Sequence, residues 1–222
     1  MLKTLEQSLQ INKGNDKQKS LSIELLEREK LKKIIDRFGK SLDILDSDIE
    51  HEVVKEHLEH LGLLPKNLIS VIKNLDIKIK IRNTDMLGMS DDNRFREEAP
   101  RGSFQSDWGG VPGCYDAKTN TVYAGKGRHG SSSLVLHELG HGVGLLLKLN
   151  NNPNVIDAHK RLYCKLTSYF QQDGPGGLAG REELLTESFA DYFILSKSKF
   201  IKKYDEDWRS FLGKIIVCDS IN

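Results

Sequence analysis

The segment Leu134–Gly144 reads LVLHELGHGVG and contains the pattern His-Glu-x-x-His. Residues four apart on a helix project from the same side, so His137 and His141 can present their imidazoles to one ion. Zn²⁺ binds imidazole nitrogen in tetrahedral geometry, and a catalytic zinc site keeps one position for water. Glu138 adjoins the first histidine and is placed to take a proton from that water. The spacing therefore predicts Zn²⁺ bound by His137 and His141, with Glu138 as the general base.

The residues around this motif indicate a buried helix that carries a site. Its apolar residues are Leu134, Val135, Leu136, Leu139, Val143, Leu145 and Leu146. Histidine and glutamate in such a helix need polar partners, and a metal supplies them. Gly140, Gly142 and Gly144 each cost about 1 kcal/mol relative to alanine in a helix interior. Close packing around a site would explain that cost.

A later helix is expected to supply the third ligand. Arg181–Phe193 reads REELLTESFADYF and places Glu183, Glu187 and Asp191 at intervals of four residues. Weakly polar neighbours point Glu187 inward, so we assign it as the third ligand, with Glu183 as the alternative. Asp191, one turn on, is expected to accept a hydrogen bond from a ligand histidine and so to orient its ring.

The order of the predicted elements indicates an α+β fold. Helices with apolar stripes occupy the chain before residue 75, the first of them stopping near Gly39 and the last beginning at Pro65. Ile77–Arg82 and Thr121–Ala124 alternate or cluster like strands, and residues 84–113 are typical of surface loop. Four helices are predicted after the second strand, over residues 132–149, 154–171, 182–196 and 206–216. We expect a helical N-terminal segment, residues 1–62, and a catalytic domain, residues 63–222.

Three histidines mark the second helix of the N-terminal segment. Ser47 and Glu50 form an S-x-x-E capping box that predicts its start, and it ends at Gly62. His57 and His60, which follow His51, are three apart and could share a metal. Their charged neighbours favour a solvated helix face instead.

Charge and composition exclude several classes of function. The chain of 222 residues has 33 basic and 32 acidic residues, so no strong field draws it to nucleic acid or to a membrane surface. No apolar run approaches the roughly 20 residues that span a bilayer. The N-terminus has no apolar signal-peptide core, and the three cysteines form no C-x-x-C pair and no disulfide framework. We expect neither nucleic-acid binding nor a membrane span.

The segment Gly125–Gly130, GKGRHG, matches the dinucleotide pattern G-x-G-x-x-G between a strand and a helix. The helix that it opens carries HELGH, no parallel strand is predicted after it, and a polar Asn/Pro turn stands where a ribose-binding carboxylate belongs. We interpret the glycines as a tight turn, with Ser131 or Ser132 as the helix cap.

Three stretches carry a resemblance to a known family: Ser133–His141 (SLVLHELGH), Glu187–Phe193 (ESFADYF) and the closing helix Trp208–Ile216. With them, residues 65–218 resemble the zinc-peptidase family of anthrax lethal factor and the secreted Pro-Pro endopeptidases. The resemblance implies a zincin-like fold and a peptide substrate that adds to a sheet edge formed by Thr121–Ala124. It also suggests delivery outside or to another cell, although no N-terminal signal is visible.

Two positions depart from the family pattern. Gly144 stands where family members tend to have an aspartate, and Gly180 stands seven residues before Glu187, where they place a tyrosine that helps to stabilise the oxyanion. Tyr169 could supply that hydroxyl if Gly174–Gly180 is an insertion, or it could be a tyrosine of a helix face.

The sequence therefore predicts a zinc-dependent endopeptidase, and the resemblance suggests that it is a secreted toxin or effector. Two alternatives stay open: a catalytically silent, zinc-stabilised binding module, and a toxin subunit in which residues 1–62 bind a partner. The presence of Glu138 argues against the silent module, because a structural zinc site needs no general base.

Overall fold

Four short strands form one mixed sheet in the computed structural model, which describes residues 24–100 and 107–217. The strand order is β1-β2-β4-β3. β1, β2 and β4 are parallel neighbours, and β3 pairs antiparallel with β4. Their bounds are Leu42–Ile44 (β1), Lys78–Ile81 (β2), Gly113–Asp116 (β3) and Thr121–Ala124 (β4).

The structure corrects the expected position of Thr121–Ala124, which lies inside the sheet and does not form its edge. β4 pairs with β2 through Ile79 and Val122 and with β3 through Cys114 and Tyr123. All four β4 residues are buried, as expected for a strand with neighbours on both sides. The sheet edge that contacts the helix Leu134–Leu146 is therefore β3, for which the sequence predicted no strand.

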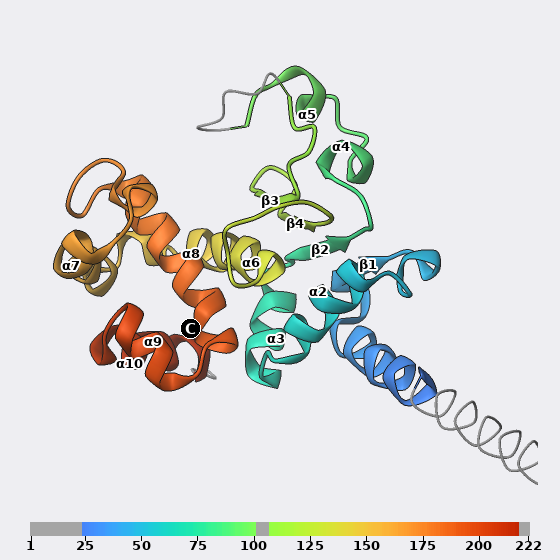
Figure 1. The fold of residues 1–222 in the computed structure, drawn as a ribbon, viewed down its shortest axis with the longest axis horizontal. Coiled ribbons are helices and arrows are strands. Elements are labelled where there is room, and N and C mark those ends of the chain that lie inside the picture. The colour runs from blue at the N-terminus through green and yellow to red at the C-terminus, as the bar shows by residue number, and fades with distance from the viewer. Residues whose placement is uncertain (1–23, 101–106, 218–222) are drawn as a thin grey trace, which may run out of the picture.

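Helices surround this sheet and make up most of the described chain (Figure 1). They are residues 24–38, α2 (Glu52–Gly62), α3 (Lys66–Asn74), α4 (Met86–Met89), α5 (Arg94–Glu97), α6 (Leu134–Leu146), α7 (Pro153–Leu162), α8 (Leu178–Ile194), α9 (Lys197–Lys203) and α10 (Glu206–Val217). The α+β class is confirmed, but α7 stops before the predicted end and α9 was not predicted. Within the described residues, no helix has the length and apolar character to cross a bilayer.

α6 lies between the sheet and α8, and α7, α9 and α10 lie on the α8 side of the molecule (Figure 1). The first turn of α6 is capped by Ser133 and not by Ser131 or Ser132. The Ser133 Oγ atom accepts a hydrogen bond from the Leu136 N–H at 3.4 Å. The α6 glycines allow α8 to approach. A Cβ at Gly140 would lie 2.9 Å from Thr186 Cα, and one at Gly144 would lie 2.9 Å from Leu185 Cδ2.

One hydrophobic core joins the N-terminal helices to the rest of the chain. It contains Phe38, Leu58, Ile79, Leu136 and Trp208 among its buried members. Arg37 ties the first described helix to the end of α2 by donating to the Gly62 carbonyl at 3.1 Å. The division into residues 1–62 and 63–222 stays a prediction about independent folding, since the described parts of both share this core.

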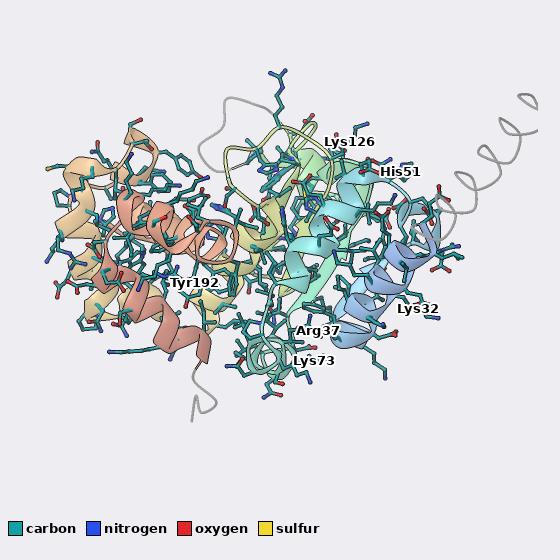
Figure 2. The ribbon with its side chains drawn as sticks, turned by 60° about the horizontal axis from the view of Figure 1, so that its bottom comes forward. Lys32, Arg37, His51, Lys73, Lys126 and Tyr192 are labelled. Carbon is teal, nitrogen blue, oxygen red and sulfur yellow. The ribbon has the colours of Figure 1, made fainter. Side chains whose placement is uncertain are left out.

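The capping box predicted at Ser47 and Glu50 does not form. Asp46–Asp48 makes a 3-10 turn, and α2 begins at Glu52 with His51 as its N-cap. The solvated-face interpretation is wrong for His57, which is 2% exposed. Its Nε2 donates to the Gly125 carbonyl at 3.1 Å and so links α2 to the loop before α6. Figure 2 shows Lys126, the residue after Gly125, near the end of α2 at which His51 lies.

The contact of His57 predicts an acid-sensitive step in stability. Burial lowers the pKa of His57 below its ordinary value of 6.5, so the unfolded chain binds more protons in acid and the free energy of unfolding falls as pH drops below about 6.5. His57→Gln keeps a hydrogen-bond donor but cannot titrate. Urea unfolding should be measured between pH 5 and 8 in the presence of a chelator, so that metal release plays no part. As the pH falls, the free energy of unfolding should decrease less in the variant than in the parent. Parallel pH curves would contradict this.

Candidate metal centre

Two packed helices bring the candidate ligands together. α6 supplies His137 and His141, and α8 supplies Glu183. The Glu183 Oε2 atom lies 3.5 Å from His137 Nε2 and 3.9 Å from His141 Nε2. One ligand atom from each of the three residues lies within 4.8 Å of the other two.

The spacing of these atoms fits a tetrahedral metal ion. Zn–N and Zn–O bonds of about 2.0–2.1 Å place neighbouring ligand atoms roughly 3.4 Å apart, close to the distances between Glu183 and the two histidines. The Glu183 Oε2 atom is buried and makes no hydrogen bond of standard geometry within the described residues. A buried carboxylate oxygen in that condition is costly unless a cation faces it. The residues present therefore fit a bound divalent metal.

Glu187 contacts the opposite nitrogen of the His137 ring. His137 Nδ1 lies 3.1 Å from Glu187 Oε2 and 3.0 Å from Ser131 Oγ. Because His137 Nε2 faces Glu183, the geometry favours Glu183 as the third ligand and Glu187 as the carboxylate that orients the ring. The assignment of Glu187 as a ligand stays a prediction. Ser131 is a site residue that the sequence offered only as a helix cap.

Asp191 lies one turn further along α8 and holds α9 in place. It accepts hydrogen bonds from Lys203 Nζ at 2.6 Å and from the Tyr204 hydroxyl at 2.7 Å. Lys203 Nζ also lies 3.4 Å from Glu187 Oε1. The contact with His137 Nδ1 that was expected of Asp191 is made by Glu187 instead.

Carboxylates and imidazoles shift each other's proton affinities in this site. Burial acts to lower the pKa of His137, but its hydrogen bonds with Glu183 and Glu187 outweigh burial and raise the pKa to about 10. Burial acts to raise the pKa of Glu187, but hydrogen bonds from His137 and Ser131 lower it to about 2. The site thus stabilises positive charge at the ring, and because a metal binds only the neutral imidazole, an ion at this site would displace that proton.

Glu138 lies in the wall of a cavity of about 610 Å³ that also contains His137 and Glu187. Burial raises its pKa to about 7, with Glu183 adding to that shift while His137 and a hydrogen bond from the Tyr115 main chain oppose it. A carboxyl group with a pKa near neutrality can both accept and return a proton. The remaining walls are formed by Pro112, Gly113, Arg128, His129, Gly130, Ser131, Leu134, Thr167, Tyr169, Phe170 and Lys203.

The G-x-G-x-x-G segment contributes to this cavity and shows no nucleotide-binding topology. Arg128, His129 and Gly130 form part of the wall. In the described part of the chain, no strand follows α6, so the second parallel strand of a dinucleotide fold is missing there.

Tyr169, the possible substitute for the family tyrosine that Gly180 replaces, lies in the loop before α8 and not on a long helix face. It lines the cavity, and its interaction with the Glu183 carboxylate helps to lower the pKa of that group. A side chain at Gly180 has no room, because its Cβ would collide with the Phe170 carbonyl oxygen and lie 2.7 Å from His159 Nε2. The role of Tyr169 as the donor of the oxyanion hydroxyl stays a prediction.

Comparisons with known proteins agree with this geometry. The family described as "Anthrax toxin lethal factor, N- and C-terminal domain" matches residues 25–211. Among solved structures, the Pro-Pro endopeptidase PPEP-2 from Paenibacillus alvei has a similar fold, with a TM-score of 0.62 and 17% sequence identity over 81% of this chain and 99% of that chain. A search among curated proteins finds no match. The structure thus has the zincin-like α+β fold, and the chain belongs to the anthrax toxin lethal factor family, which is a protease family.

Proposed function

We propose that this protein is a zinc-dependent endopeptidase. The observation that carries the proposal is the convergence of His137 Nε2, His141 Nε2 and Glu183 Oε2, with His137 and Glu138 both in the wall of the adjoining cavity. Membership of a protease family supports the reaction class. Zinc suits two imidazoles and one carboxylate, a donor set that leaves a fourth position open for water or substrate.

His137, His141 and one carboxylate of α8 would hold the metal, and the geometry favours Glu183 over Glu187. Bound zinc would lower the pKa of a water molecule and polarise the substrate carbonyl. Glu138 would take the proton of the attacking water and later deliver it to the leaving amine. Glu187 and Ser131 contact Nδ1 of His137 and so would hold its ring in orientation.

The Tyr169 hydroxyl would donate a hydrogen bond to the oxyanion that develops on the substrate carbonyl. Tyr169 lines the cavity together with His137 and Glu138, and it interacts with the Glu183 carboxylate. A donor held near a metal site before substrate arrives loses little free energy to reorganisation.

The substrate of this proposal is an extended peptide paired with the edge strand β3. Pro112 and Gly113, at the start of β3, line the cavity that holds Glu138. β3 pairs with β4 on one side only, so its other side can accept main-chain hydrogen bonds from an added strand. Secretion or delivery to another cell as a toxin or effector belongs to the same proposal and rests on the family alone.

Metal analysis of matched α8 variants tests the ligand set. Glu183→Gln should lose most bound zinc, as should His137→Ala and His141→Ala, whereas Glu187→Gln should retain zinc with affinity lowered about 10- to 100-fold. Glu182→Gln is the control, since Glu182 faces Asn150 at 3.4 Å. Loss of zinc in Glu187→Gln with full zinc in Glu183→Gln would restore Glu187 as the ligand.

Glu138→Gln tests the general base. The variant keeps the size of the side chain but cannot take a proton, so cleavage of peptide libraries should fall by about 10²-fold or more. Its zinc content should match the parent, and its Tm should be equal or slightly higher because a buried carboxylate has been neutralised. Cleavage at the parental rate would remove this mechanism. A zinc-loaded parent that cleaves no peptide would favour the silent binding module.

Tyr169→Phe tests the oxyanion donor. Loss of the hydroxyl should lower kcat by about tenfold or more and leave zinc content unchanged. Tyr192→Phe is the control. Tyr192 lies near the C-terminal end of α8 and does not line the cavity. A parental kcat in Tyr169→Phe would return Tyr169 to a structural role.

A further inference from the structure

The loop between α7 and α8, residues 163–177, carries Tyr169 to the metal centre. It contains two 3-10 turns, Tyr163–Lys165 and Ser168–Gln171, and follows α7 at the α8 side of the molecule (Figure 1). Thr167, Tyr169 and Phe170 line the cavity. Because these residues lie in a loop and not in a long helix, the position of the Tyr169 hydroxyl depends on what anchors the loop.

His159 makes that anchor from the side of α7. Its side chain is fully buried. The Gly176 N–H donates to His159 Nδ1 at 2.8 Å, and His159 Nε2 lies 2.7 Å from the Phe170 carbonyl oxygen. A ring nitrogen that accepts from an amide carries no proton, so Nε2 holds the proton and donates to the carbonyl. One neutral imidazole thereby joins two points of the loop, on either side of its turn at Asp173 and Gly174.

The opposite side of the loop is fixed by α8. Gly180 lies against the Phe170 carbonyl and His159 Nε2, where a Cβ would collide with the carbonyl. Phe170, the residue after Tyr169, is thus held between a histidine of α7 and a glycine of α8. The loop's own hydrogen bonds, such as Gln172 Nε2 to the Tyr169 carbonyl at 2.7 Å, shape the loop but do not attach it to α7.

We propose that His159 is a positioning residue that holds the Tyr169 loop over the metal centre. His159 does not line the cavity, so it acts through Tyr169 and not on the substrate. The role in catalysis rests on the proposed function, whereas the anchoring of the loop does not. Loss of the anchor would leave the hydroxyl free to move by an ångström or more, enough to weaken its contribution to the reaction.

A double-mutant cycle with Tyr169→Phe tests how His159 acts. His159→Ala should lower kcat about 5- to 20-fold in the parent and less than about twofold in the Tyr169→Phe background, because the group through which it acts is already gone. KM and zinc content should change little. His159→Gln, which keeps a donor toward the Phe170 carbonyl, should recover part of the loss. Equal losses in both backgrounds would overturn the proposal by assigning His159 a general structural role.

Amide hydrogen exchange supplies a readout that needs no peptidase activity. His159→Ala should speed exchange at Gly176 and across residues 163–177, and Gly180→Ala should do the same from the α8 side. Val155→Ala, an equally buried substitution one turn earlier on α7, is the control and should leave loop exchange and kcat near parental. If His159→Ala does not fold, exchange in His159→Gln and Gly180→Ala still decides whether these contacts hold the loop.

Unchanged exchange in the loop of every folded His159 variant would overturn the proposal, whatever the enzyme's activity. A parent that cleaves no peptide would contradict the proposed function. The exchange measurement would then still decide whether His159 holds the loop.

Discussion

The close approach of α6 and α8 is the contact on which the site depends. Gly140 faces the main chain of Thr186, where even a methyl group would meet the Cα atom at 2.9 Å. Because backbone cannot rotate aside as a flexible side chain can, alanine at this position would force the helices apart. The histidines of one helix and the glutamates of the other meet only at the observed spacing. Glycine at this position lowers the stability of the isolated helix, but it allows α6 and α8 to pack closely.

Metal binding and folding are linked in this arrangement. Glu138, Glu183, Glu187 and Asp191 lie within one region of α6 and α8, and Lys203 supplies the nearby lysine charge for two of them. His137 and Ser131 offset the burial of Glu187, but burial raises the pKa of Glu138, so a charge on Glu138 is costly in the metal-free protein. A cation that binds the folded chain and not the unfolded one stabilises the former by mass action. A metal held by the residues that would perform the chemistry would therefore also stabilise the native state.

The chemistry of the site was easier to predict than its exact membership. The i, i+4 spacing of His137 and His141, within an apolar helix, was sufficient to place both imidazoles on one side. The same spacing made Glu183 and Glu187 equivalent, because helical periodicity does not say which ring nitrogen of His137 a carboxylate faces. That distinction depends on the rotation of α8 about its axis, which packing against α6 determines. Ser131 and His159 were missed because each acts through contacts between segments far apart in the sequence.

Short elements were also the part of the fold that was hardest to predict from the sequence. The strand Gly113–Asp116 has four residues with no clear alternation, and only pairing with Thr121–Ala124 makes it a strand. The helix predicted to begin at the Ser47 capping box begins at Glu52 instead, and from there it buries Val54, His57 and Leu58. In both places tertiary contacts decided between local alternatives that the sequence left nearly equal.

The edge strand β3 also bears on how the protein stays soluble. An open sheet edge offers main-chain groups to any passing strand, including those of other copies of the chain. This edge is only four residues long. It therefore offers an unrelated strand only a short run of main-chain groups. The brevity of the edge thus works against self-association while leaving one end of it beside the cavity.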